Sequence, residues 1–136
     1  GRGENIRDWL YVEDHARAIH TVFEGAQAGS TYNVGGHAER RNIDVVQSLC
    51  NILDRIKPRT DKASYAKQIS YVTDRPGHDF RYAIDSAKLE TELGWKPQES
   101  FETGLEKTVR WYLENERWWR PLLERNYAGQ RLGLKA

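Results

Sequence analysis

Methionine is absent from this sequence of 136 residues, and cysteine occurs only once, at Cys50. A single cysteine excludes an intramolecular disulfide framework and is typical of a reducing compartment, so we expect a cytoplasmic protein. The chain also lacks any apolar run near the roughly 18 residues that a membrane span needs. Because position 1 is glycine, we expect that residue 1 is not a natural start.

An excess of one charge sign is also missing, since 21 basic and 20 acidic residues leave a net charge of +1. Such a balance provides no sequence-wide field for nucleic acid or for a membrane surface, and we expect neither as a partner. With 38% hydrophobic and 30% charged residues, the composition is that of a rather polar globular chain. Its length suits one domain with a real core.

Several catalytic motifs are missing as well. There is no P-loop, no zinc-type spacing of Cys or His, and no G-x-S-x-G elbow. None of the seven tyrosines has a lysine four residues later. Gly1-Arg2-Gly3 begins like a dinucleotide fingerprint, but Ile6 stands where the spacing fails and no strand precedes it. The residues alone therefore predict binding groups without a catalytic set, and no metal site.

Residues 1–36 are predicted to alternate strand, helix and strand. Residues 6–12 are rich in aromatic and β-branched side chains and indicate a strand. A helix is expected to begin at Glu13-Asp14, with Asp14 as its N-cap, and to stop near Gly25. Residues 31–34 indicate a second, buried strand. This succession predicts an α/β fold with a parallel crossover.

The rest of the chain is predicted to be mostly helical. Asn42 is expected to cap a helix that Pro58 ends, followed by a polar loop over residues 59–67. Further helices are predicted after the caps Asp85 and Ser100, and residues 121–136 are expected to be weakly ordered. The expected buried positions are Val46, Leu49, Cys50, Leu53 and Ile56 in the first of these helices and Leu105, Val109, Tyr112 and Leu113 in the last.

A bend over residues 74–79 joins two β-like stretches, residues 69–73 and 81–84. Pro76 fixes its own φ, and Gly77 permits a conformation that a β-carbon would forbid. The bend should display Arg75 and His78 together, a pair that suits an anionic oxygen cluster such as a diphosphate. The alternative is a surface turn whose charged residues lie in water, because Pro-Gly is first of all a turn signal.

Several blocks of sequence carry a resemblance to a known family. They are I-R-D-W-L-Y-V-E-D-H-A-R-A from residue 6, Y-N-V-G-G-H from residue 32, D-R-P-G-H-D-F-R-Y-A-I-D from residue 74 and L-G-W-K-P from residue 93. In this order they resemble the dTDP-glucose 4,6-dehydratases, which are extended short-chain dehydrogenase/reductases. The first block occurs more loosely in sugar-nucleotide epimerases, whereas the block at residue 74 is more specific to the dehydratases.

The resemblance is to the C-terminal part of that family. Family members begin with a Rossmann half that holds the Gly-rich NAD loop, a Tyr-x-x-x-Lys pair and an Asp-Glu acid/base pair. The resemblance therefore implies a truncated α/β chain, in which residues 1–136 form the C-terminal sugar-nucleotide-binding lobe plus the last Rossmann-type strands. It implies NAD in the full-length enzyme, no cofactor on this chain alone, no catalytic residue within it, and an inactive isolated chain.

In the family, NAD takes a hydride from C4 of the glucose unit, water is lost across C5 and C6, and the hydride returns to C6. The product is dTDP-4-keto-6-deoxy-glucose, a precursor of rhamnose and other deoxysugars. Carried over by motif, Arg7, Arg75 and His78 would contact the diphosphate and nucleotide end, with Asn42 lining the same site. The full set of substrate-binding residues that the resemblance implies is Arg7, Asn42, Asp74, Arg75, Pro76, Gly77 and His78.

The resemblance also implies a homodimer for the full-length enzyme. Strands that lose their neighbours leave unpaired edges and apolar surface, so the isolated chain is expected to be marginally stable, self-associating or rearranged. Two other readings stay open. One is another enzyme of the superfamily, such as a UDP-galactose epimerase or a UDP-glucuronate decarboxylase. The other is a non-catalytic module that uses Trp111, Trp118 and Trp119 as a contact surface.

Overall fold

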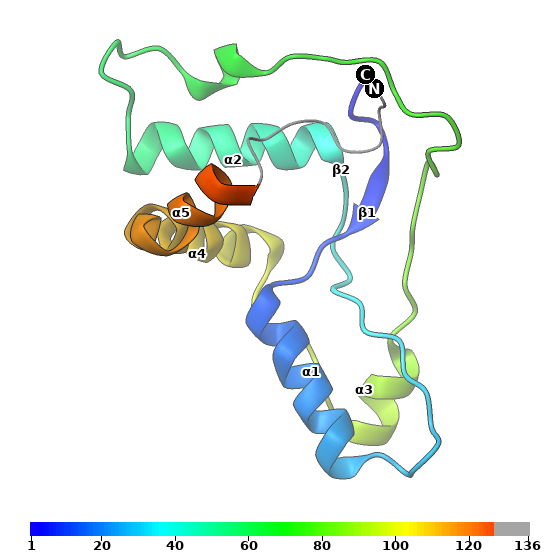
Figure 1. Ribbon diagram of the computed structural model, residues 1–136. Coiled ribbons are helices and arrows are strands. Elements are labelled where there is room, and N and C mark those ends of the chain that lie inside the picture. Colours follow the sequence, from blue (N-terminus) through cyan, green and yellow to red (C-terminus); the bar gives the residue numbers. More distant parts are fainter. Residues whose placement is uncertain (127–136) are drawn as a thin grey trace.

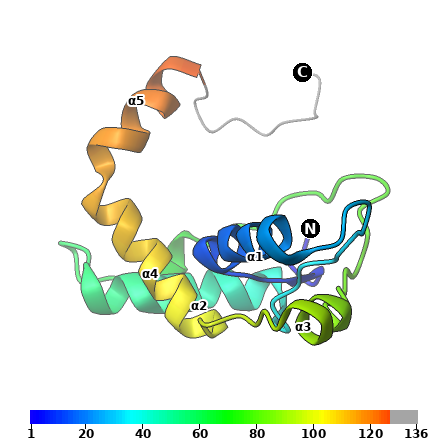
Figure 2. The same cartoon turned by 90° about the horizontal axis from the view of Figure 1, so that it is seen from below.

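The computed structural model describes residues 1–126 (Figure 1). Helices α2 and α4 pack on one another in one part of the molecule, and α1 packs beside α3 in another (Figure 1). Helix α5 follows α4 and projects away from the rest of the chain (Figure 2). The elements are β1 (Ile6–Asp8), α1 (Val12–Gly25), β2 (Glu39–Arg41), α2 (Asn42–Ile56), the 3-10 helix η1 (Tyr65–Gln68), α3 (Ala87–Leu93), α4 (Phe101–Glu114) and α5 (Glu116–Asn126).

The two strands pair antiparallel, with Arg7 opposite Arg40. The prediction of a parallel crossover is therefore wrong, as is that of a strand at residues 31–34, which belong to neither strand of the described sheet. The Asp8 carboxylate accepts hydrogen bonds from the backbone N–H groups of Gly36 and Ala38, both at 2.8 Å. These bonds hold the chain after residue 34 beside β1, so that it enters β2 in the opposite direction.

Helix α1 begins earlier than predicted, at Val12 with Tyr11 in the N-cap position, so the strand predicted over residues 6–12 ends at Asp8. Asp14 is not the N-cap. The residue is 2% exposed, and its carboxylate forms an ion pair with Arg17 and accepts hydrogen bonds from the backbone N–H groups of residues 98 and 99 at 3.1 and 3.0 Å. A carboxylate buried in this way fixes the connection between α3 and α4 onto α1. The predicted stop at Gly25 is confirmed.

The core is small and lies between α1 and α3. Ala18, Leu89 and Trp95 are buried there, and flanking apolar side chains pack around them. A second packed region lies where α2 contacts α4, and Cys50 of α2 and Val109 of α4 are both buried. Cys50 is thus a core residue, as predicted, and burial raises the pKa of its thiol. These two regions, rather than a central sheet, hold the chain together.

The predicted helix caps are only partly confirmed. Ser100 caps α4 in a capping box with Thr103, and Gly94 ends α3 with a φ of 67°. Asn42 is instead the first residue of α2, after the N-cap Arg41. Asp85 lies one residue before the N-cap of α3, although its carboxylate accepts the backbone N–H of Ala87 at 2.9 Å. Ser100, Asn42 and Asp85 each lie within two residues of a helix start.

Three further predictions need correction. The polar loop at residues 59–67 contains the start of η1, because the Asp54 carboxylate accepts Ser64 Oγ at 2.6 Å and the Tyr65 N–H at 2.8 Å. Tyr112 was expected on the buried face of α4 but is 52% exposed. Residues 121–126, expected to be weakly ordered, are part of α5, whereas residues 127–136 lie outside the described residues. Among the helices up to residue 126, none is long and apolar enough to cross a membrane.

We expect the substitution Asp14→Ala to lower the free energy of unfolding by about 2–3 kcal/mol, because it leaves two part-buried N–H donors without their acceptor and Arg17 without its ion-pair partner. The exposed neighbour Glu13 provides the matched control, and Glu13→Ala should change stability by less than about 0.5 kcal/mol. Urea unfolding followed by circular dichroism measures both. Equal stability of the two variants would contradict the role given to Asp14.

Candidate functional site

The bend at residues 74–79 lies beside β1 in space, although the two are far apart in the sequence (Figure 1). Two backbone hydrogen bonds attach it, from the Ile6 N–H to the Phe80 carbonyl at 2.8 Å and from the Tyr82 N–H to the Ile6 carbonyl at 3.1 Å. Ile6 and Arg81 form a parallel bridge. Apart from this bridge, the β-like stretches predicted at residues 69–73 and 81–84 have no regular secondary structure. The bend therefore depends on side chains to hold it.

Gly77 lies at the tip of this bend with a φ of 66°. An added β-carbon would meet no atom within 4 Å, so the glycine is required by its backbone conformation and not by lack of space. Pro76 precedes it in the same turn, and both residues are exposed. Proline followed by a residue with positive φ is the pattern of a type II turn.

Arg7 of β1 is the residue that connects the strand to the bend. Its guanidinium donates to the Ile6 carbonyl at 2.6 Å, to the Asp79 carbonyl at 3.0 Å and, more weakly, to the Phe80 carbonyl at 3.5 Å. It also lies 3.0 Å from Nε2 of His78. A guanidinium only donates, so Nε2 accepts and the ring proton lies on Nδ1. Only the Nε–H of Arg7 is left without an acceptor among the described residues.

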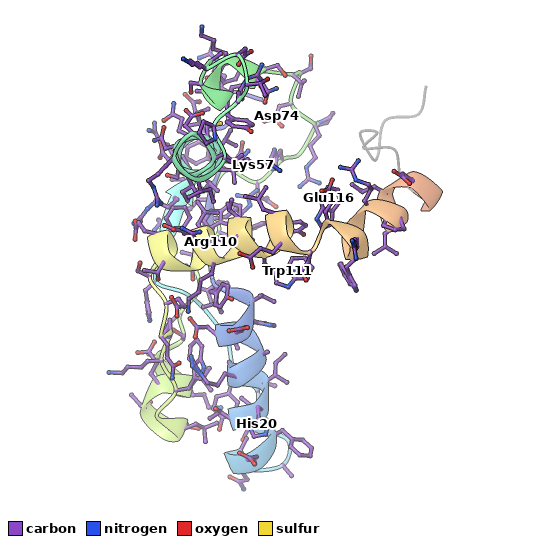
Figure 3. The ribbon with its side chains drawn as sticks, turned by 90° about the vertical axis from the view of Figure 1, so that its left-hand side faces the viewer. His20, Lys57, Asp74, Arg110, Trp111 and Glu116 are labelled. Carbon is purple, nitrogen blue, oxygen red and sulfur yellow. The ribbon has the colours of Figure 1, made fainter. Side chains whose placement is uncertain are left out.

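The hydrogen bonds continue from His78 to Asp74. His78 Nδ1 donates to the Asp74 carboxylate at 2.8 Å, and the backbone N–H of Arg75 donates to the same oxygen at 2.8 Å. These bonds, that of His78 first, hold the pKa of Asp74 below its ordinary value. Asp74 lies at the opposite end of the molecule from His20 of α1 (Figure 3). Arg7, His78 and Asp74 thus form one continuous chain of hydrogen bonds, which we call the Arg7–His78–Asp74 chain.

The remaining predicted site residues are less closely joined. Arg75 is exposed, and within residues 1–126 its side chain makes no hydrogen bond or ion pair. Asn42 contacts the region through its backbone, whose N–H donates to the Asn5 carbonyl at 2.9 Å. The Asn5 side chain in turn donates to the Asp79 carbonyl at 3.1 Å. The side chain of Asn42 itself makes no hydrogen bond to the bend within the described part of the chain.

Tyr82 was not predicted as part of the site. The Arg7 guanidinium carbon lies 4.3 Å from the centroid of the Tyr82 ring, and the Tyr82 hydroxyl donates to the Asp79 carboxylate. That hydrogen bond raises the pKa of Tyr82. Arg81 points to the other side of the segment, where Glu39 binds its guanidinium at 2.7 and 2.9 Å. Because successive side chains of a strand point to opposite faces, the sequence could have predicted that Arg81 and Tyr82 face opposite ways. It does not say which of the two faces Arg7.

The charges around the bend are unequally paired. Glu39 neutralises Arg81, and Asp44 binds Arg41 at 2.8 Å. Arg7 and Arg75, by contrast, have no carboxylate partner in the described region, and the charges of both act on the Tyr82 hydroxyl. Two guanidinium groups without a counter-ion can bind an anionic oxygen cluster.

The residues described here do not fit NAD. Dinucleotides bind where a glycine-rich turn joins a strand to a helix N-terminus, and the connection from β1 to α1 contains no glycine. Gly36 lies against the Trp9 carbonyl, where a β-carbon could not be placed, and leads into a strand instead. Within residues 1–126, no group of three His, Cys, Asp or Glu side chains is arranged to hold a metal ion.

The class of protein follows from comparison with known families. The chain belongs to the GDP-mannose 4,6 dehydratase family, whose model matches residues 1–108.

Individual relatives carry a more specific name than the family model does. A dTDP-glucose 4,6-dehydratase of Escherichia coli is 57% identical over 136 residues, which are 98% of this chain and 38% of that protein. The structure of the Bacillus anthracis dTDP-glucose 4,6-dehydratase in complex with NAD is similar with a TM-score of 0.76 and 45% identity, covering 90% of this chain and 36% of that one. The structure of a Streptomyces venezuelae dTDP-glucose 4,6-dehydratase with NAD bound is similar with a TM-score of 0.78 and 42% identity. The match covers 90% of this chain and 35% of that one.

The resemblance to dTDP-glucose 4,6-dehydratases and the α/β class of the fold are thereby confirmed. The chain spans little more than a third of the length of these relatives.

We expect the substitution His78→Ala to raise the pKa of Asp74 toward its ordinary value, because the hydrogen bond that lowers it is removed. Since the folded-state pKa is lowered, the stabilisation from this contact is fully present above about pH 4, the unfolded value, and is lost as the pH falls through the folded value. An NMR titration of the Asp74 carboxyl carbon measures the pKa. His15→Ala is the control, and an unchanged Asp74 pKa in His78→Ala would contradict this contact.

Proposed function

We propose that this chain is the nucleotide-diphosphate-binding part of a dTDP-glucose 4,6-dehydratase, the enzyme that converts dTDP-glucose to dTDP-4-keto-6-deoxy-glucose and water. The observation that carries the proposal is the bend, where Arg7 and Arg75 lack carboxylate partners among the described residues. The bend lies in a chain that is 57% identical to an enzyme of that name. The complete enzyme would act in the cytoplasm in deoxysugar synthesis.

The residues of the bend and of β1 would have different roles in binding. Arg75, exposed and unpaired within residues 1–126, would form the charge-assisted hydrogen bonds to the diphosphate. Arg7 would add its charge and its Nε–H from a fixed position, since its other donors hold the bend. His78 and Asp74 would keep the Pro76–Gly77 turn in shape. Binding energy from this remote part of the substrate would orient the sugar for chemistry elsewhere.

The chemistry itself would need residues other than these. The described residues hold no Tyr-x-x-x-Lys pair and do not fit NAD, so we propose residues 1–136 as the C-terminal, sugar-nucleotide-binding region and expect no catalysis from this chain alone. In the complete enzyme, NAD would supply the hydride chemistry from another part of the protein. Formation of 4-keto-6-deoxy product by this chain with NAD alone would contradict the assignment.

The exposed apolar surface supports a further part of the proposal. On α1, Val12, Ile19 and Phe23 are 70%, 57% and 86% exposed, and on α4 and α5 the aromatic rings of Trp111 and Trp118 are also exposed. Trp111 and Glu116 lie on either side of the junction of α4 and α5 (Figure 3). Apolar patches of this kind favour association. We expect self-association of this chain alone and a homodimer for the complete enzyme.

Two other functions make different predictions for ligand binding. The family description points to a GDP-sugar instead of a dTDP-sugar, and a UDP-sugar enzyme of the same superfamily is a related possibility. A non-catalytic module would bind none of the three nucleotide diphosphates. Competition among dTDP, GDP and UDP distinguishes all of these.

We expect calorimetry to detect dTDP binding to the chain at micromolar concentration, and Arg75→Ala to weaken it by about tenfold to a hundredfold, the loss typical of a hydrogen bond to a charged group. Arg59→Ala is the matched control, because the Arg59 guanidinium is occupied by Asp61 in a loop away from the bend. Equal losses in both variants, or tighter binding of GDP or UDP, would contradict the proposed function.

A further inference from the structure

Arg7 is held from two directions. In the plane of its guanidinium it donates to the carbonyls of Ile6 and Asp79 and to the His78 ring. Over its face lies the ring of Tyr82, with 4.3 Å between the guanidinium carbon and the ring centroid. Hydrogen bonds in the plane of the guanidinium restrict its movement out of that plane less than its movement within it. An aromatic ring packed on the face of the guanidinium limits the out-of-plane movement.

We propose that Tyr82 is a positioning residue, which fixes the Arg7 guanidinium through the face of its ring and so sets the shape of the diphosphate-binding bend. The inference rests on the proposed function for its ligand, and on the contact between two side chains for its geometry. Nothing in the proposed function requires Tyr82 to touch the substrate.

The position of Tyr82 is itself set by the bend. Its backbone N–H donates to the Ile6 carbonyl at 3.1 Å, and its hydroxyl donates to the Asp79 carboxylate. The Asp79 carbonyl accepts from Arg7 at 3.0 Å. Arg7, Asp79 and Tyr82 therefore form a closed ring of contacts around the end of β1, in which each residue restrains the other two.

The separate parts of Tyr82 contribute differently. The aromatic face contacts Arg7, whereas the hydroxyl contacts Asp79. Phenylalanine keeps the first contact and loses the second, and leucine loses both. Tyr82 is 47% exposed, so neither substitution opens a core cavity. Tyr71, which is 64% exposed in the same segment, provides the matched control Tyr71→Leu.

The first test is the NMR signal of the Arg7 Nε–H group, identified by its disappearance in Arg7→Lys. The ring current of Tyr82 should shift this proton upfield in the wild-type chain, in Tyr82→Phe and in Tyr71→Leu. In Tyr82→Leu the signal should move to the position of a free arginine. A wild-type signal already at the free position would overturn the inference, and this holds even if Tyr82→Leu fails to fold.

The second test is calorimetric titration of the full chain with dTDP. Tyr82→Phe should bind within about twofold of the wild-type chain, and Tyr82→Leu about threefold to thirtyfold more weakly, the range of a cation–π contact. Equal affinity of Tyr82→Leu and wild type would overturn the positioning role. Absence of binding by the wild-type chain would instead contradict the proposed function, and the Arg7 signal alone would then decide the inference.

Discussion

The contact between the Arg7 guanidinium and the residues of the bend is the interaction on which the site depends. The bend has little regular backbone pairing of its own, since a single bridge at Arg81 and two hydrogen bonds to Ile6 attach it to β1. Arg7 adds its donors to the Asp79 carbonyl and the His78 ring, so that one side chain joins two segments more than 70 positions apart. Without it, the Pro-Gly turn would be an ordinary surface turn.

The acceptors around Arg7 explain how one residue can combine a structural role with the binding role that we propose. Carbonyls and a neutral imidazole satisfy the donors of a guanidinium without cancelling its charge. The pairing of Glu39 with Arg81 on the other side of the segment keeps that carboxylate away from Arg7. The site therefore retains positive charge while its geometry is fixed, the combination that binding of a diphosphate requires.

The α/β class could be predicted from the sequence, and the site residues proposed from a motif stay a prediction. Arg7, Asp74 and His78 were identified by a motif, and their types already specify hydrogen bonds that the structure contains. The helices α1, α2 and α4 follow from apolar periodicity, and Ser100 from its capping chemistry. The strand predicted at residues 31–34 was wrong and the β-like stretch at residues 69–73 forms no ladder, because a strand needs a partner and β propensity does not name one. Tyr82 was missed because its role depends on which face of an extended segment meets Arg7.

The tautomer of His78 tests the central claim most directly, because the Arg7–His78–Asp74 chain allows only one. Nitrogen-15 NMR of the imidazole distinguishes a proton on Nδ1 from one on Nε2. The account predicts a neutral ring with its proton on Nδ1, donated to Asp74, and with Nε2 accepting from Arg7. A proton on Nε2 would show that Arg7 does not donate to this ring, and would contradict the account.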